Sequence, residues 1–133
     1  MKVLALDFGP ARTGVAVSDP TGTIARPLCV VERAHTDAGL ERVKLLVADE
    51  TVEQVVVGLP LTLRGERGDQ ARASEQFAAR LRKLLDVPVV LFDERFTTDL
   101  AQQAPSDEAE LDARAAAHLL SSFLAWSSAG STA

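Results

Sequence analysis

The hydrophobic periodicity of the chain changes after residue 32, and this change limits the fold more than any other feature. Before it, short apolar runs separated by turn residues predict three strands, over residues 2–8, 14–19 and 23–32. Pro27 indicates that the third is an edge strand or contains a bulge. Because only short turns separate the three strands, we expect an antiparallel meander.

After residue 32, helical and strand-like periods alternate. Leu40, Val43 and Leu46 share one face of a helix that Thr36 or Asp37 can cap. Further helices are predicted over 69–85, 97–104 and 108–126. Two β-branched apolar runs, over 52–59 and 87–92, are typical of strands covered on both faces.

This order predicts an α/β fold with a five-stranded mixed sheet. The sheet begins with three antiparallel meander strands, continues with crossover strands, and carries helices on both faces. A length of 133 residues favours a single domain. We expect it to span 1–126, with 127–133 as a flexible tail of small and polar residues.

Composition narrows the class of protein. No apolar stretch is long enough to span a membrane, and a single cysteine fits a reducing cytoplasm. The net charge of −5 argues against a protein that simply coats nucleic acid, and 5% aromatic residues argue against a broad base-stacking platform. Eleven of the 14 basic residues are arginine, which is suited to phosphate but also fits a bias in composition.

Three acidic residues stand at the ends of predicted elements. Asp7 ends the first strand, Glu94 follows the last strand, and Asp112 lies in the first turns of the last helix. Each has a structural alternative: Asp7 can accept backbone N–H bonds in a turn, Glu94 can pair with Arg95 or cap a helix, and Asp112 can interact with the helix dipole.

If these three acids converge, their mutual repulsion favours a divalent cation. Mg²⁺ and Mn²⁺ prefer oxygen ligands and bind together with phosphate. Two such ions can activate water against a phosphodiester. The sequence offers little for a zinc site or a Cys-His nucleophile, because His35 and His118 are far apart along the chain and Cys29 has no CxxC partner.

The turn from Gly9 to Gly14 is also open to a nucleotide-binding interpretation. It lacks the Gly-Lys-Ser/Thr of a phosphate loop. An Asp-x-Gly turn between two strands does occur in sugar kinase and actin-like ATPase folds, which are normally far longer. A lone nucleotide-binding domain therefore stays open as an alternative.

Four motifs, in order, resemble the signatures of the YqgF/RuvX family. They span nearly the whole chain: Leu6-Asp7-Phe8-Gly9 with Arg12 to Asp19, Val57-Gly58-Leu59-Pro60-Leu61 with Gly65 and Gly68 to Ala71, Asp93 to Thr98, and Leu111 to Ala116. The family has a ribonuclease H-like fold. Its members are described as candidate Holliday junction resolvases and as nucleases that process the 5′ end of precursor 16S ribosomal RNA.

The resemblance implies a hydrolase with Asp7, Glu94 and Asp112 as catalytic, metal-binding acids. Mg²⁺ or Mn²⁺, as two ions, would be the cofactor. The implied phosphate contacts are made by Arg12, Arg64, Arg67 and Arg95. The implied partner is nucleic acid, either an rRNA precursor or branched DNA, with no membrane and with a homodimer where a junction is the substrate.

The chain departs from the family pattern at four positions. Thr62 replaces a usual Asn, Arg64 stands where an acidic or small polar residue is common, Phe96 replaces Leu, and Glu110 replaces a frequent basic residue. None removes a catalytic acid, so these changes bear on substrate contacts. A non-catalytic nucleic-acid or ribosome-assembly binding module stays open as an alternative.

Overall fold

The computed structural model describes residues 1–61, 64–94 and 108–130. Within them lie five strands and three helices. The strands are β1 (Val3–Asp7), β2 (Arg12–Ser18), β3 (Ala25–Glu32), β4 (Gln54–Leu59) and β5 (Val89–Asp93). The helices are α1 (Asp37–Asp49), α2 (Asp69–Leu84) and α3 (Glu108–Gly130).

The strands form one mixed sheet in the order β3-β2-β1-β4-β5. The first three are antiparallel neighbours, and β4 pairs parallel with β1 and with β5. The predicted meander followed by crossover strands is therefore confirmed. Pro27 lies in the edge strand β3, where the register with β2 shifts between Val15 and Ala16, as expected for a residue that cannot donate to the ladder.

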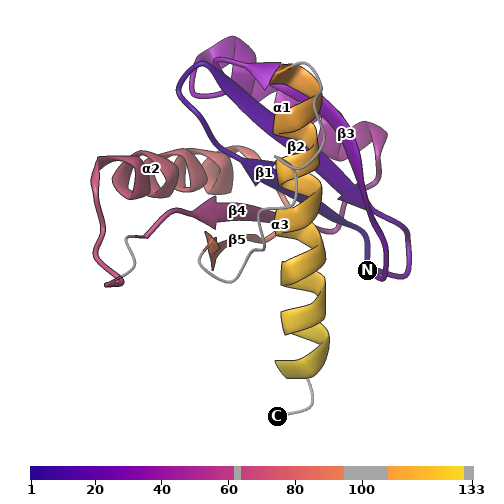
Figure 1. Ribbon diagram of the computed structural model, residues 1–133. Helices are drawn as coiled ribbons and strands as arrows, with labels where there is room; N and C mark the ends of the chain where they lie inside the picture. Colours follow the sequence, from indigo (N-terminus) through magenta and orange to yellow (C-terminus); the bar gives the residue numbers. More distant parts are fainter. Residues whose placement is uncertain (62–63, 95–107, 131–133) are drawn as a thin grey trace.

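Helices cover both faces of the sheet, also as predicted. The larger buried cluster joins α1 and α2 to one face through residues such as Leu6, Val43 and Leu81. A second cluster joins α3 to the other face through Ala5, Val56 and Leu120. Figure 1 shows α3 crossing one side of the sheet, with its N-terminal end near the meander strands.

Local signals explain two of these elements. Thr36 caps α1, its side chain accepting a hydrogen bond from the Gly39 N–H at 3.1 Å. Val55, Val56 and Val57 are fully buried, and they alternate between the two clusters. This agrees with the expectation that β4 is covered on both faces.

The structure differs from the expectation at the end of the chain. Helix α3 continues to Gly130, four residues beyond the predicted end at Trp126. Serine and alanine are compatible with a helix, so residues 127–130 extend it rather than begin a tail. The helix expected from Thr97 or Thr98 to Ala104 lies outside the described residues. In the described part of the chain, no helix is long and apolar enough to cross a membrane.

Candidate functional site

Asp7 and Glu94 lie at the carboxyl ends of β1 and β5, on the face of the sheet that α3 covers. Side chains alternate between faces along a strand, and Val3 and Ala5 belong to the cluster under α3. Asp7 therefore faces the same way. Glu94 follows β5 directly, and its side chain lies against Gly58 of β4 on that face.

The two carboxyl groups share a hydrogen bond, which requires one of them to hold a proton. Burial raises the pKa of Glu94 from its ordinary 4.5 to about 8, and the negative charge of Asp7, the shared hydrogen bond and the charge of Asp93 act in the same direction. A paired, partly buried carboxyl that titrates near neutral pH is typical of a functional site.

Two strand glycines make the room that this arrangement needs. A Cβ on Gly58 would lie 2.2 Å from Glu94 Oε1 and 2.9 Å from its Cδ. A Cβ on Gly14 would lie 1.9 Å from the backbone oxygen of Asp112. Gly14 pairs in register with Asp7, and Gly58 follows Val57, which pairs with Leu6. The strands on both sides of Asp7 thus carry a glycine where another acidic residue approaches.

Asp112 is anchored by Arg12 at the start of β2. Arg12 Nε donates to Asp112 Oδ2 at 2.7 Å, and both side chains are partly exposed. Buried Ala113 and Ala116 bring the helix over the sheet face, above Gly14.

The structure brings Asp7 and Glu94 together and places the start of α3 directly beside them. It does not join Asp112 to them in one cluster of carboxylates. Among the described residues, no group of three acidic, histidine or cysteine side chains is placed to hold a metal ion. The three-acid metal site therefore stays a prediction, with two of its members in contact and the third held by Arg12.

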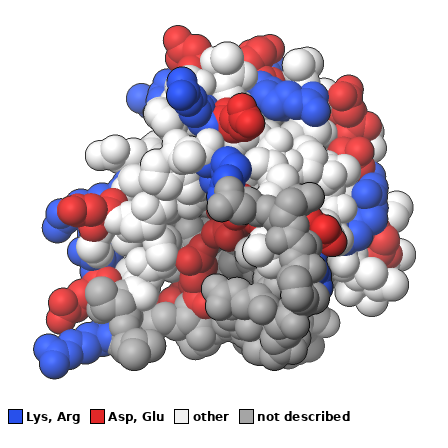
Figure 2. All heavy atoms as spheres, turned by 45° about the horizontal axis from the view of Figure 1, so that its top comes forward, with Lys and Arg blue, Asp and Glu red and all other residues white. Residues whose placement is uncertain are grey.

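The arginines predicted to contact phosphate have different surroundings. Arg12 binds Asp112, and Arg67 Nη2 lies 2.6 Å from Glu75 Oε1 on α2. Arg64 is exposed in the loop that an isolated Leu61–Arg67 bridge closes, and Arg95 lies outside the described residues. Figure 2 shows acidic side chains near the middle of one face with a basic side chain directly above them.

Sequence reasoning missed the role of the two glycines. It placed Gly14 at the boundary between a turn and a predicted strand over 14–19, whereas β2 begins at Arg12 and Gly14 lies inside it. A glycine inside a strand marks close approach of a neighbouring group, and that signal was available at Gly14 and at Gly58. The raised pKa of Glu94 comes first from burial, which the sequence does not display.

Comparison with known proteins places the chain among nucleases. The family model RuvX, described as Holliday junction resolvase, matches residues 1–126. A relative from Roseiflexus sp. (strain RS-1) is 40% identical over 131 residues, covering 92% of this chain and 93% of the relative. A relative from Maridesulfovibrio salexigens is 37% identical over 133 residues, covering 94% and 98%. Both carry the name "Putative pre-16S rRNA nuclease".

Solved structures agree on the fold. RuvC of Thermus thermophilus in complex with Holliday junction substrate matches with a TM-score of 0.61 and 18% identity, over 98% of this chain and 97% of that one. A second Thermus thermophilus RuvC structure matches with a TM-score of 0.58 and 18% identity, over 95% and 96%. The expected ribonuclease H-like fold is confirmed, and the match over residues 1–126 shows that the chain belongs to the RuvX family.

Proposed function

We propose that this protein is a metal-dependent nuclease that hydrolyses phosphodiesters of structured RNA, in the 5′-end processing of precursor 16S rRNA. The observation that carries the proposal is the hydrogen-bonded pair of Asp7 and Glu94 at adjoining strand ends, with a glycine on each side of Asp7. The names of the relatives supply the substrate class. The matched region, residues 1–126, would contain the whole nuclease domain.

The donor set fits a hard divalent cation. A carboxyl pair that shares a proton at neutral pH offers oxygen ligands and excess negative charge to a cation that replaces that proton. Asp7 and Glu94 would hold Mg²⁺ or Mn²⁺, and Asp112 would complete the site. Two bound ions of this kind supply an activated water and neutralise the charge that develops on the leaving oxygen.

The chain's own residues have distinct tasks in this proposal. Gly58 lets Glu94 reach Asp7, and Gly14 lets α3 carry Asp112 to the same end of the sheet. Arg12 neutralises Asp112 through their 2.7 Å contact, and it would bind a substrate phosphate once that carboxylate takes another cation. Arg64, Arg67 and Arg95 would contact more distant phosphates.

Cleavage of a four-way DNA junction is the second candidate. The description of the RuvX family, and the structural match to a RuvC that is bound to Holliday junction substrate, favour this substrate. Cutting a junction symmetrically needs two active sites, so this candidate requires a homodimer. Sedimentation of the protein with and without a junction tests that requirement.

A side-by-side cleavage assay tests the proposal. Precursor 16S rRNA and a four-way junction are offered to wild type, Asp7→Asn and the exposed control Asp49→Asn, with Mg²⁺, Mn²⁺ or EDTA. We expect wild type and Asp49→Asn to cut the RNA only with metal. We expect Asp7→Asn to be slower by about a thousandfold or more, about 4 kcal/mol of transition-state stabilisation.

Three other outcomes separate the alternatives. Metal-dependent cutting of the junction alone supports the resolvase. Binding without cutting, unaffected by EDTA or by Asp7→Asn, supports a non-catalytic assembly module. Full cleavage by Asp7→Asn contradicts the assignment of Asp7. A cytoplasmic location is part of the proposal, because the precursor rRNA of bacteria is processed there.

A further inference from the structure

A pocket of about 310 Å³ opens at the same end of the sheet as the acidic pair, on the face that α1 and α2 cover. Its walls come from three parts of the chain: the turn after β1, the segment before α1 and the middle of α2. The residues that matter most here are Phe8, Pro10, His35, Gln76, Phe77 and Arg80. None of them belongs to the acidic site.

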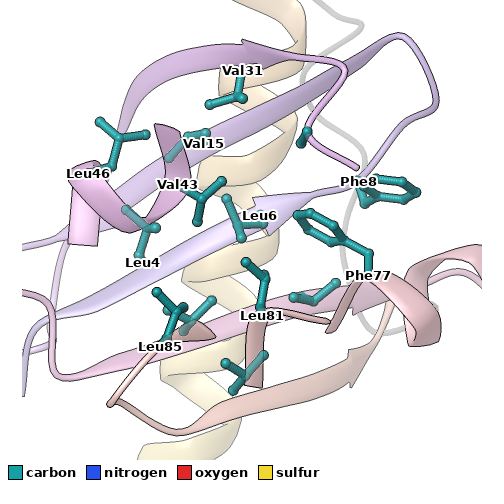
Figure 3. Packing of buried hydrophobic residues seen from close by; sticks show 14 of the residues in the cluster. Leu4, Leu6, Phe8, Val15, Val31, Val43, Leu46, Phe77, Leu81 and Leu85 are labelled. Carbon is teal, nitrogen blue, oxygen red and sulfur yellow. The ribbon is translucent and has the colours of Figure 1, made fainter. Parts of the chain in front are cut away.

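The walls of the pocket are aromatic. The rings of Phe8 and Phe77 stack with centroids 4.4 Å apart and an interplanar angle of 21°, and Figure 3 shows them side by side. The His35 ring stands at 90° to Phe8, with the centroids 6.5 Å apart. Both phenylalanines are buried, whereas His35 is exposed. A flat aromatic ligand could therefore stack on the exposed imidazole, and the buried phenylalanines would form the base of the pocket beneath it.

Polar groups stand at the rim. Gln76 is exposed on α2 and presents an amide, which can donate and accept hydrogen bonds to a base edge. Arg80 donates to the backbone oxygen of His35, and its Nη2 lies 3.3 Å from Asp37 Oδ1. These contacts connect α2 to the segment that carries His35, so the two sides of the pocket are linked before any ligand arrives.

The pocket is connected to the acidic pair through the backbone. Phe8 follows Asp7 directly, and consecutive Cα atoms are about 3.8 Å apart. The backbone oxygen of Phe8 accepts a hydrogen bond from Gln70 Nε2 at 3.0 Å, which ties this position to the start of α2. A strand whose phosphate lies at Asp7 could therefore place a neighbouring base at Phe8 and His35.

We propose that this pocket binds one unpaired nucleobase of the RNA strand, next to the phosphodiester that the acidic residues engage. The inference rests on the proposed nuclease function and adds a substrate feature to it, an unstacked nucleotide beside the cleavage site. Flat walls with a few polar groups at the rim are how proteins bind splayed-out bases of single-stranded RNA. The volume suits one base rather than a base-paired RNA helix. The low aromatic content of the chain also favours contact with a single base over stacking of many bases.

The test measures binding in EDTA, so that cleavage does not enter. The probes are a short single-stranded RNA from the 5′ flank of precursor 16S rRNA and a series in which each nucleotide in turn is abasic. Fluorescence anisotropy gives the affinity of wild type, His35→Ala and Gln76→Ala. The control is Lys44→Ala, which changes an exposed residue of α1 outside the pocket.

We expect one abasic position to weaken binding to wild type by about tenfold, the size of a base-stacking contribution. His35→Ala should weaken binding of the intact RNA by a similar factor and should have no further effect on the RNA that is abasic at that position. The slope of affinity against salt should stay unchanged, because stacking releases no counterions. Lys44→Ala should not show this coupling to the abasic position.

Two results would overturn the inference. One is equal affinity of wild type, His35→Ala and Gln76→Ala for the intact RNA. The other is that His35→Ala weakens binding by the same factor for the intact RNA and for the RNA that is abasic at each position in turn. Failure of the nuclease proposal would look different, because it would appear as absent metal-dependent cleavage in the assay above while the coupling measured in EDTA persists.

Discussion

At the scale of single residues, the acidic pair is the most unusual feature of the chain. Two carboxyl groups that share a hydrogen bond in a partly buried site are costly unless a proton or a cation lies between them. Arg12 has the corresponding role for Asp112, since its guanidinium lies 2.7 Å from that carboxylate. The shared proton and Arg12 therefore neutralise the negative charge that the proposed metal ions would balance when bound.

The raised pKa of Glu94 makes stability depend on pH. Below about pH 4.5 the carboxyl is protonated in both the folded and unfolded states and has no effect. Between 4.5 and about 8 the unfolded chain loses the proton that the folded chain keeps, so the free energy of unfolding falls as pH rises. Above about pH 8 the loss is complete, on the order of a few kcal/mol.

Glu94→Gln should remove this fall, because a neutral amide does not titrate. Urea unfolding of wild type and Glu94→Gln at pH 5 and pH 8, without metal, measures the difference. We expect the variant to gain stability relative to wild type as the pH rises. An equal change in both proteins would contradict the protonation assigned to the pair.

At the scale of elements, two glycines position the strands and helices around Asp7. Replacing one should mainly lower the cleavage rate, and replacing the other should mainly lower stability. Alanine at Gly58 meets the Glu94 side chain, which can rotate away, so folding should be little affected. Cleavage should fall by about a hundredfold, the usual effect of misplacing a catalytic group by an ångström. Alanine at Gly14 meets the backbone of α3, which must shift, so the free energy of unfolding should fall by about 1–3 kcal/mol.

Urea unfolding and cleavage rates of the two variants, measured together, separate these effects. Gly68→Ala is the matched control, because nothing lies within 4 Å of a Cβ at that position. It should change neither quantity by much. Loss of stability in Gly58→Ala with normal cleavage would show that the contact with Glu94 is structural only.

Much of the architecture could be predicted from the sequence, because periodicity and turn residues are local signals. The meander, the buried strand β4 and the Thr36 cap all follow from such signals. The position of Asp7 at the end of a strand was also local information. The shared proton, the partner of Arg12 and the approach of Asp112 to Gly14 join residues up to 100 positions apart, so they depend on tertiary packing.

At the scale of the whole molecule, the two faces of the sheet have separate roles. The face under α1 and α2 contains the larger buried cluster, and the face under α3 carries the acidic pair at its edge. The proposed base pocket opens on the face under α1 and α2, at the end of β1. A single strand of substrate could thus engage both sides of one sheet edge.

A net charge of −5 makes the local arginines important for binding a polyanion. Replacing both Arg64 and Arg67 with alanine should reduce the dependence of RNA affinity on salt. The slope of log affinity against log salt should change by about 0.7 to 0.9 for each phosphate contact that is lost. Affinity measured at several salt concentrations gives this slope, and an unchanged value would exclude the two side chains from phosphate contact.

The most direct test is an isothermal calorimetric titration of Mn²⁺ into the nucleic-acid-free protein at pH 7. Repeating the titration in buffers of different ionisation enthalpy gives the number of protons released on binding. The central claim is that Asp7 and Glu94 share a proton that a divalent cation displaces. We expect wild type to bind Mn²⁺ and release about one proton, Glu94→Gln to bind more weakly and release none, and Asp37→Asn to match wild type. Binding by Glu94→Gln with the affinity and proton release of wild type would contradict the claim.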